Sequence, residues 1–157
     1  NAGKRLCLEA EWQFSCEGQV LLDYPYGPIW TPKTCNGERA EHPLVELFPK
    51  DPFNPKNFTD SCVNQLPSSL SQTGSYFRCQ SVFGVLDLVG NLHEWIDQKI
   101  DKSEQNSQSN KPKGVFRGGF YADTIRNGPG CKYRTIRHNS SYWDYSTGFR
   151  CCANLAD

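Results

Sequence analysis

Eight cysteines in a chain of 157 residues constrain the fold more than any other feature of the sequence. Their number is even and they are scattered without repeated C-x-x-C pairs, a pattern typical of disulfides rather than zinc ligands. Stable disulfides form in oxidising compartments, so we expect a secreted, periplasmic or cell-surface protein. The predicted disulfide cysteines are Cys7, Cys16, Cys35, Cys62, Cys79, Cys131, Cys151 and Cys152.

The spacing of these cysteines leaves most of the connectivity open. Neighbouring residues of a strand point to opposite faces, so Cys151 and Cys152 should serve two different bridges. At least two of Cys35, Cys62 and Cys79, which lie in a loop region, are expected to join each other.

Length and charge exclude several classes of protein. The chain fits one domain, residues 1–157, with 17 Lys plus Arg balancing 17 Asp plus Glu. A neutral chain lacks the basic footprint of a nucleic-acid binder, and no apolar run approaches the roughly 20 residues of a membrane span. Asn57 and Asn139 begin glycosylation sequons, so both are candidate glycan sites.

One helix is expected near the start of the chain. Residues Glu9–Cys16 combine glutamates in the first turn with Ala10, Trp12 and Phe14, which should form the buried side. Gly18 follows at a position where glycine ends helices.

The rest of the chain predicts short strands and long loops. Tyr24–Asn64 holds most of the ten prolines and should be irregular, with short strands at most. Asp101–Lys113 is a polar, low-complexity run that should form a mobile loop. Val115–Tyr121 and Phe149–Ala153 are expected to be strands. The fold class is therefore an irregular, loop-rich α+β domain with little regular secondary structure and several disulfides.

Three motifs in order resemble the formylglycine-generating enzyme, or sulfatase-modifying factor, family. They are Gly3–Trp12 (GKRLCLEAEW), Gly84–Trp95 (GVLDLVGNLHEW), and the RGG of Arg117–Gly119 with the GFRC of Gly148–Cys151. The resemblance spans nearly the whole chain and implies a fold related to C-type lectins. It also implies that this is the C-terminal portion of the family domain, lacking its N-terminal segment. We therefore expect an N-terminal segment or partner chain to cover exposed core.

The second motif has the chemistry of a calcium loop. Calcium prefers six to eight oxygens from carboxylates and backbone carbonyls, and Asp87 and Glu94 flank a turn that Gly90 allows to bend. The alternative is that both carboxylates cap turns and pair with arginines such as Arg117. The resemblance implies a structural Ca²⁺, with Asn91 bracing the turn. The implied ligands are the side chains of Asp87 and Glu94 and the carbonyls of Gly90 and Leu92.

The family's catalytic thiol pair is incomplete in this sequence. By resemblance, the enzyme oxidises a sulfatase cysteine with two copper-binding cysteines that follow the RGG motif. Asp123 stands in place of the first, and only Cys131 could serve as the second. The resemblance instead pairs Cys131 with Cys16, and it implies a partner for Cys151 before Asn1, with Cys7 as the alternative. Catalytic residues are therefore expected to be absent, with Cys131 and copper relevant only if the chain is an enzyme.

Two stretches fall where related folds present their ligand surface. Rigid rings among short polar groups suit recognition, although an ordinary polar loop packed on the core is the alternative. Arg134, Arg137 and Arg150 are expected to form structural salt bridges. The candidate ligand-binding residues are Asp123, Arg126, Asn127, His138, Asn139, Tyr142, Trp143 and Tyr145.

Three functions are consistent with these observations. The leading one is a non-catalytic, calcium-stabilised binding or structural module that recognises a protein or glycan. The rival is a formylglycine-generating oxidase or another oxidoreductase of the family, for which a count of two free thiols, rather than none, would be the sign. The third is a subunit of a larger assembly.

Overall fold

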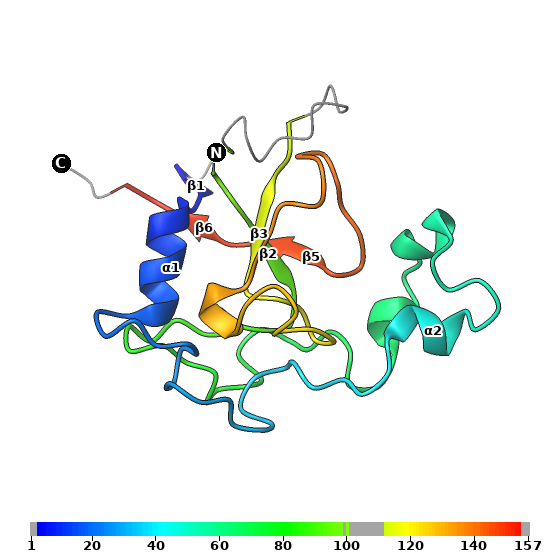
Figure 1. Ribbon diagram of the computed structural model, residues 1–157, viewed down its shortest axis with the longest axis horizontal. Helices are drawn as coiled ribbons and strands as arrows, with labels where there is room; N and C mark the ends of the chain where they lie inside the picture. The colour runs from blue at the N-terminus through cyan, green and yellow to red at the C-terminus, as the bar shows by residue number, and fades with distance from the viewer. Residues whose placement is uncertain (1–2, 99, 101–111, 155–157) are drawn as a thin grey trace.

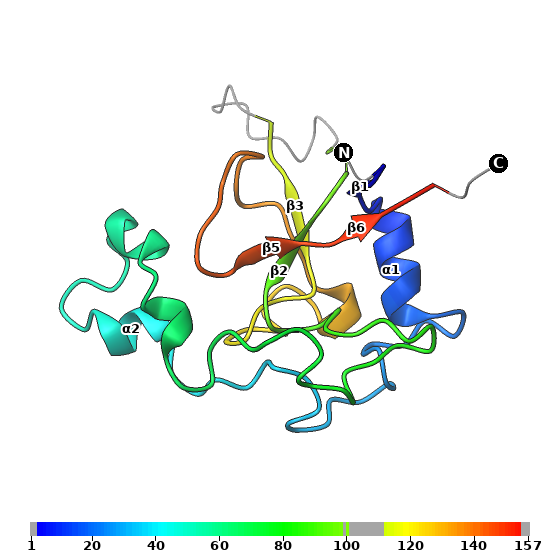
Figure 2. The ribbon, with the colours of Figure 1, turned by 180° about the vertical axis from the view of Figure 1, so that it is seen from behind.

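The structure is a computed structural model that describes residues 3–98, 100 and 112–154. It is an α+β domain in which a four-stranded mixed sheet, of order β4-β3-β2-β5, lies between helix α1 and a lobe of short helices around α2 (Figures 1 and 2). A second sheet, β1-β6, packs beside α1. In chain order the elements are β1 Arg5–Leu6, α1 Glu9–Glu17, α2 Pro43–Leu47, η1 Pro55–Thr59, η2 Val63–Gln65, β2 His93–Ile96, β3 Val115–Arg117, η3 Gly130–Lys132, β4 Arg134–Thr135, β5 Thr147–Phe149 and β6 Cys151–Cys152.

Helix α1 confirms the predicted helix but buries a narrower side than expected. Gly18 ends it with φ +64°, and its N–H donates to the carbonyl of Phe14. Trp12 and Cys16, four residues apart, face the core, whereas Ala10 and Phe14 are exposed. The helix docks through one edge only, so Phe14 stacks at the surface on Phe83, with ring centroids 5.0 Å apart.

Both predicted C-terminal strands are shorter than expected, for local reasons. The strand starting at Val115 stops at Arg117 because Gly118 and Gly119 have φ values of +81° and +73°, which turn the chain away. The predicted strand Phe149–Ala153 is divided into β5 and β6 at Arg150. The guanidinium group of Arg150 pairs with Glu94 at this break.

The proline-rich region 24–64 forms short helices where we expected short strands at most. Pro43 lies in the first turn of α2, and Pro55 lies in the first turn of η1. A backbone N–H in the first turn has no acceptor within the helix, so proline, which lacks that N–H, fits there without loss of a hydrogen bond. His42 and Asn54 precede them, and each side chain accepts a backbone N–H. The predicted loop Asp101–Lys113 lies largely outside the described residues.

Three disulfides join segments that are distant in the chain. Cys7–Cys152 ties the start of the domain to β6, and Cys35–Cys79 lies beneath the loops. Cys16–Cys131 fastens α1 to η3 and is the pair that the family resemblance implies. No helix of the described residues is long and apolar enough to cross a membrane.

Cys62 and Cys151 form no disulfide within chain 1–157, where both are exposed thiols. This corrects the expectation that Cys62 joins another cysteine of the chain and the alternative that Cys151 joins Cys7, whereas a partner for Cys151 before Asn1 stays a prediction. Cys7 bonds to Cys152 rather than to Cys151, and the alternation of strand β6 turns Cys151 outward. Cys62 lies just before η2 in the lobe of short helices around α2, here called the outer lobe, away from the buried Cys35–Cys79 pair.

The chain should therefore contain two reactive thiols. Titration of the unreduced protein with DTNB is expected to give two thiols per chain, because both sulfurs are exposed. Cys62→Ser and Cys151→Ser should each give one. A count near zero or above two in chain 1–157 would contradict this connectivity.

Candidate functional site

Strand β2 sends consecutive side chains to opposite faces of the sheet and so creates two polar sites. Glu94 lies opposite Arg117 of β3 in the strand register and faces α1, whereas His93 faces the other side. Trp95 and its β3 neighbour Phe116 share the side of His93. The α1 side holds the predicted calcium loop, and the opposite side holds a recess.

On the α1 side, the carboxylate of Glu94 is buried and accepts three charge-assisted hydrogen bonds. The indole N–H of Trp12 donates to Oε2 at 2.6 Å. Arg150 donates from Nε to Oε2 and from Nη2 to Oε1, both at 2.6 Å. Arg150 also donates to the carbonyl of Leu86 at 3.0 Å, which connects the pair to the predicted calcium loop.

Arg117 does not take the role that we considered for it, because it pairs with Glu9 rather than with Glu94. Its guanidinium group lies over the Trp12 ring, 5.2 Å from the centroid, and donates to the carbonyl of Cys131. Arg134 pairs with Glu9 as well, so two of the three predicted structural arginine salt bridges are formed by Arg134 and Arg150.

The turn between Asp87 and Glu94 is held in place by the backbone of Gly90 and the side chain of Asn91. Gly90 has φ +77°, and a side chain there would collide with the carbonyl of Asn36. The Asn91 side chain donates to the Ser71 carbonyl and accepts from the N–H of Ser71 and from Asn36. Asn91 thus braces the turn.

The carboxylates retain some capacity for a cation. A carboxylate has about four lone-pair positions, and Glu94 uses three of them on Trp12 and Arg150. Asp87 accepts the N–H of Gly74 through Oδ2. Both carboxylates line a cavity of about 210 Å³. The described residues contain no group of three His, Cys, Asp or Glu suited to a metal, so a cation here would need backbone carbonyls as well. Calcium stays a prediction.

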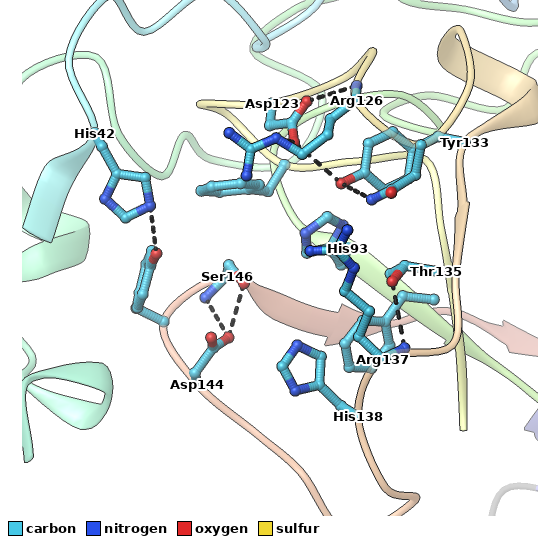
Figure 3. Close-up of a pocket in the computed structure, with 14 residues that line it drawn as sticks. His42, His93, Asp123, Arg126, Tyr133, Thr135, Arg137, His138, Asp144 and Ser146 are labelled. Atoms are coloured by element: carbon cyan, nitrogen blue, oxygen red, sulfur yellow. Dashed lines mark hydrogen bonds and ion pairs between the residues drawn. The ribbon is translucent and has the colours of Figure 1, made fainter. Parts of the chain in front are cut away.

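On the opposite face of the sheet, a recess of about 160 Å³ gathers side chains from six parts of the chain (Figure 3). They come from the start of α2, from β2, β3 and β4, and from the loops that follow β3 and β4. The recess is lined by His42, His93, Phe116, Phe120, Asp123, Arg126, Asn127, Tyr133, Thr135, Arg137, His138, Asp144, Tyr145 and Ser146.

All three histidines of the chain line this recess. Burial lowers the pKa of His93 to about 4 and also lowers the pKa values of His42 and His138. Each ring is therefore neutral at pH 7. Aromatic rings rather than other imidazoles surround His93, with Phe116 and Phe120 at centroid distances of 5.7 and 5.0 Å. The three imidazoles do not converge on a common metal position.

Five of the eight predicted ligand-binding residues line the recess, namely Asp123, Arg126, Asn127, His138 and Tyr145. The other three lie outside it. Tyr142 stacks on His138 at 3.8 Å and supports the rim, Trp143 is 68% exposed, and Asn139 closes a turn with Ser141. The second glycan candidate, Asn57, donates its side-chain amide to the carbonyl of Asp51.

Sequence reasoning missed most of the recess lining. His42 comes from the proline-rich region, and only the fold brings it to Tyr145. His93 lies within the Gly84–Trp95 motif, but the interpretation of that motif concerned only the calcium loop. Arg137 was expected in a salt bridge, but none of the described carboxylates pairs with it. The other missed residues are Phe116, Phe120, Tyr133, Thr135, Asp144 and Ser146.

The recess does not supply the ligands of a copper-thiolate site. Asp123 lines it with a carboxylate, and no cysteine lines it. Cys131 is fully buried and bonded to Cys16. Two thiolates are what a soft Cu(I) ion selects, so the residues do not fit copper.

The chain belongs to the family described as the Sulfatase-modifying factor enzyme 1-like domain, whose profile matches residues 1–155. Similar proteins include "Inactive C-alpha-formylglycine-generating enzyme 2" of Bos taurus (26% identical over 96% of this chain and 44% of that protein) and "Formylglycine-generating enzyme" of Mus musculus (27%, over 98% and 40%). A third is "Serine/threonine-protein kinase pkn1" of Chlamydia pneumoniae (26%, over 98% and 21%). The chain thus spans less than half the length of these relatives.

Two solved structures share the fold. The crystal structure of CarF aligns with a TM-score of 0.64 and 20% identity, over 98% of this chain and 48% of that one. PvdO from Pseudomonas aeruginosa aligns with a TM-score of 0.57 and 18% identity, over 94% and 51%. These likenesses confirm the predicted fold class.

Acid should destabilise the domain through His93. Between the unfolded pKa near 6.5 and the folded value of about 4, the unfolded chain binds more protons, so stability falls as pH falls. At about 1.4 kcal/mol per unit, the total is on the order of 3 kcal/mol. Urea unfolding at pH 7 and pH 4.5 should show this loss in the native chain and a much smaller loss in His93→Phe. Equal losses in both proteins would contradict the assignment.

Proposed function

We propose that this chain is a ligand-binding module of the formylglycine-generating enzyme family in which a recess replaces the thiol chemistry. The observation that carries the proposal is the lining of the recess on the β2–β3 face. The recess is lined by polar groups and rigid aromatic rings, and no cysteine lines it. Small concave sites of this composition are typical of ligand binding.

The state of Cys131 supports a non-catalytic role. A cysteine acts as nucleophile or soft-metal ligand only as a free thiolate, and the sulfur of Cys131 is bonded to Cys16. The two free thiols, on Cys62 and Cys151, do not line the recess, so a count of two free thiols no longer indicates an oxidase. One relative is named an inactive formylglycine-generating enzyme and another is named a formylglycine-generating enzyme. Similarity alone therefore does not distinguish a catalytic from a non-catalytic role.

Calcium is proposed to stabilise the module at the turn on the other face of the sheet. Asp87, Glu94 and Arg150 line one cavity and carry one more negative than positive charge, which favours a cation. The bound ion would supply charge neutralisation only, with Asp87, Glu94 and the carbonyls of Gly90 and Leu92 holding it.

The surroundings of the module are proposed from its disulfides and its apolar surface. Three disulfides suit a secreted, periplasmic or cell-surface location. A hollow of about 400 Å³ with a mixed lining that includes Leu6, Trp95 and Phe149 is where the expected N-terminal segment or partner chain would pack. Phe149 is 67% exposed in the chain alone.

The proposed loss of thiol chemistry predicts no formylglycine product. The chain should leave the cysteine of a C-x-P-x-R peptide unchanged by mass spectrometry when copper and oxygen are supplied. Asp123→Cys should stay inactive, because Cys131 remains bonded to Cys16. The active mouse relative serves as positive control. Formylglycine produced by the native chain would overturn the proposal.

Calcium removal should lower the melting temperature. EGTA is expected to destabilise the native chain and excess Ca²⁺ to restore it, because the ion offsets the repulsion of two carboxylates. Asp87→Asn should weaken the response, whereas Asp60→Asn, in the outer lobe, should not. Identical melting curves of the native chain in EGTA and in Ca²⁺ would refute a structural calcium ion.

A further inference from the structure

The two carboxylates of the recess, Asp144 and Asp123, each accept three hydrogen bonds from the protein and so keep about one free lone-pair position each. Asp144 accepts from the N–H and hydroxyl of Ser146 through Oδ1, at 2.9 and 2.8 Å, and from the hydroxyl of Tyr142 through Oδ2 at 2.7 Å. These bonds fold the loop before β5 onto itself. Asp144 therefore acts mainly as a structural anchor.

Asp123 is engaged in the same manner. Its Oδ1 accepts the backbone N–H groups of Ile125 and Arg126, at 3.2 and 3.0 Å. Its Oδ2 accepts the hydroxyl of Tyr133 at 3.3 Å and lies 3.7 Å from Nε of Arg126. A cationic ligand would thus meet two carboxylates whose oxygens are already hydrogen-bonded.

Tyr145 offers one open donor. Nδ1 of His42 accepts the N–H of Leu44 at 3.3 Å, so the neutral ring carries its proton on Nε2. This assignment follows from the hydrogen-bond network, and it makes Nε2 the donor to the Tyr145 oxygen at 3.2 Å. The hydroxyl hydrogen of Tyr145 is then free to be donated to a ligand, and burial raises the pKa of Tyr145, which keeps the hydroxyl protonated.

The guanidinium groups supply the remaining donors. Figure 3 shows the side chains of Arg126 and Arg137 reaching into the space around His93. None of the described carboxylates forms an ion pair with Arg137, and Arg126 contacts Asp123 through Nε alone. His93 is 8% exposed, and its buried Nδ1 has no hydrogen-bond partner among the described residues. The charged donors left over in the recess are therefore the two guanidinium groups, whereas the neutral ring of His93 offers one donor and one acceptor nitrogen.

The volume of the recess suits an occupant of about the size of a single ring. A cavity of about 150 Å³ lined by apolar side chains binds benzene, and this recess has about 160 Å³. The rings of Phe116 and Phe120 form part of its wall, and flat ligands stack favourably on such rings.

We propose that the recess binds a small organic anion built on one flat ring, with its carboxylate held by Arg126, Arg137 and the Tyr145 hydroxyl. The ring lies against Phe116 and Phe120. Planar guanidinium groups match the geometry of a carboxylate and hold it more strongly than neutral donors do. This inference rests on the proposed binding function and specifies its ligand class.

Three probes of one shape test the charge. The full chain is titrated with benzoate, benzamide and benzylammonium, and binding is followed by calorimetry and by the ring-proton NMR signals of the recess histidines. Benzoate should bind about tenfold or more tightly than benzamide, and benzylammonium should bind least. Inorganic phosphate, which lacks the ring, should bind more weakly than benzoate.

Two variants locate the site. Arg137→Gln, at an exposed position, should weaken benzoate binding about tenfold and leave benzamide unchanged. Arg78→Gln removes an exposed arginine outside the recess and should change neither. Equal affinity for benzoate and benzamide, preference for benzylammonium, or an unaffected Arg137→Gln would overturn the anion inference while the binding function stands. Failure of every probe to bind would overturn both.

Discussion

The carboxylate of Glu94 is the interaction on which the arrangement of the domain depends. A buried charge is tolerated only when it is paired and hydrogen-bonded, and Glu94 meets that need with Trp12 and Arg150. These residues come from α1, β2 and the break between β5 and β6, three segments far apart in sequence. Glu94 thus links the three motifs, because the first supplies Trp12, the second supplies Glu94 itself and the third supplies Arg150.

This pairing separates a structural face of the sheet from the face that carries the recess. On the α1 side, Arg117, Glu9 and the Cys16–Cys131 bridge complete a charged but satisfied interior. Because strand neighbours alternate, fixing Glu94 toward α1 directs His93 to the opposite side. The recess forms there from loops whose own hydrogen bonds hold Asp123 and Asp144 in place.

Sequence reasoning reached the features that depend on local pattern or on the family motifs. Helix α1 with its Gly18 end, the turn at Gly90, and the Cys16–Cys131 pair that the resemblance implied are all present. The break at Arg150 was not foreseeable from propensity, because a partner 56 residues away causes it. The exposure of Phe14 likewise depends on which edge of α1 docks.

The composition of the recess could be predicted only in part. Asp123 and the run from His138 to Tyr145 lie on loops near the motifs, so the resemblance predicted that they belong to the ligand surface. His42 reaches the recess only through the fold of the proline-rich region 24–64. Cys62 of the same region, which does not line the recess, is a free thiol because its expected partners, Cys35 and Cys79, bond to each other. Such long-range pairings carry no signal in spacing or periodicity.

A double-mutant cycle on Glu94 and Arg150 tests the central claim most directly. The free energy of unfolding is measured by urea denaturation, in Ca²⁺ and in EGTA, for the native chain, Glu94→Gln, Arg150→Met and the double variant. We expect about 3 kcal/mol lost in Glu94→Gln, because Arg150 is left with an unmatched charge, and a coupling energy above about 1 kcal/mol. Additive losses, with no coupling in either condition, would contradict the account.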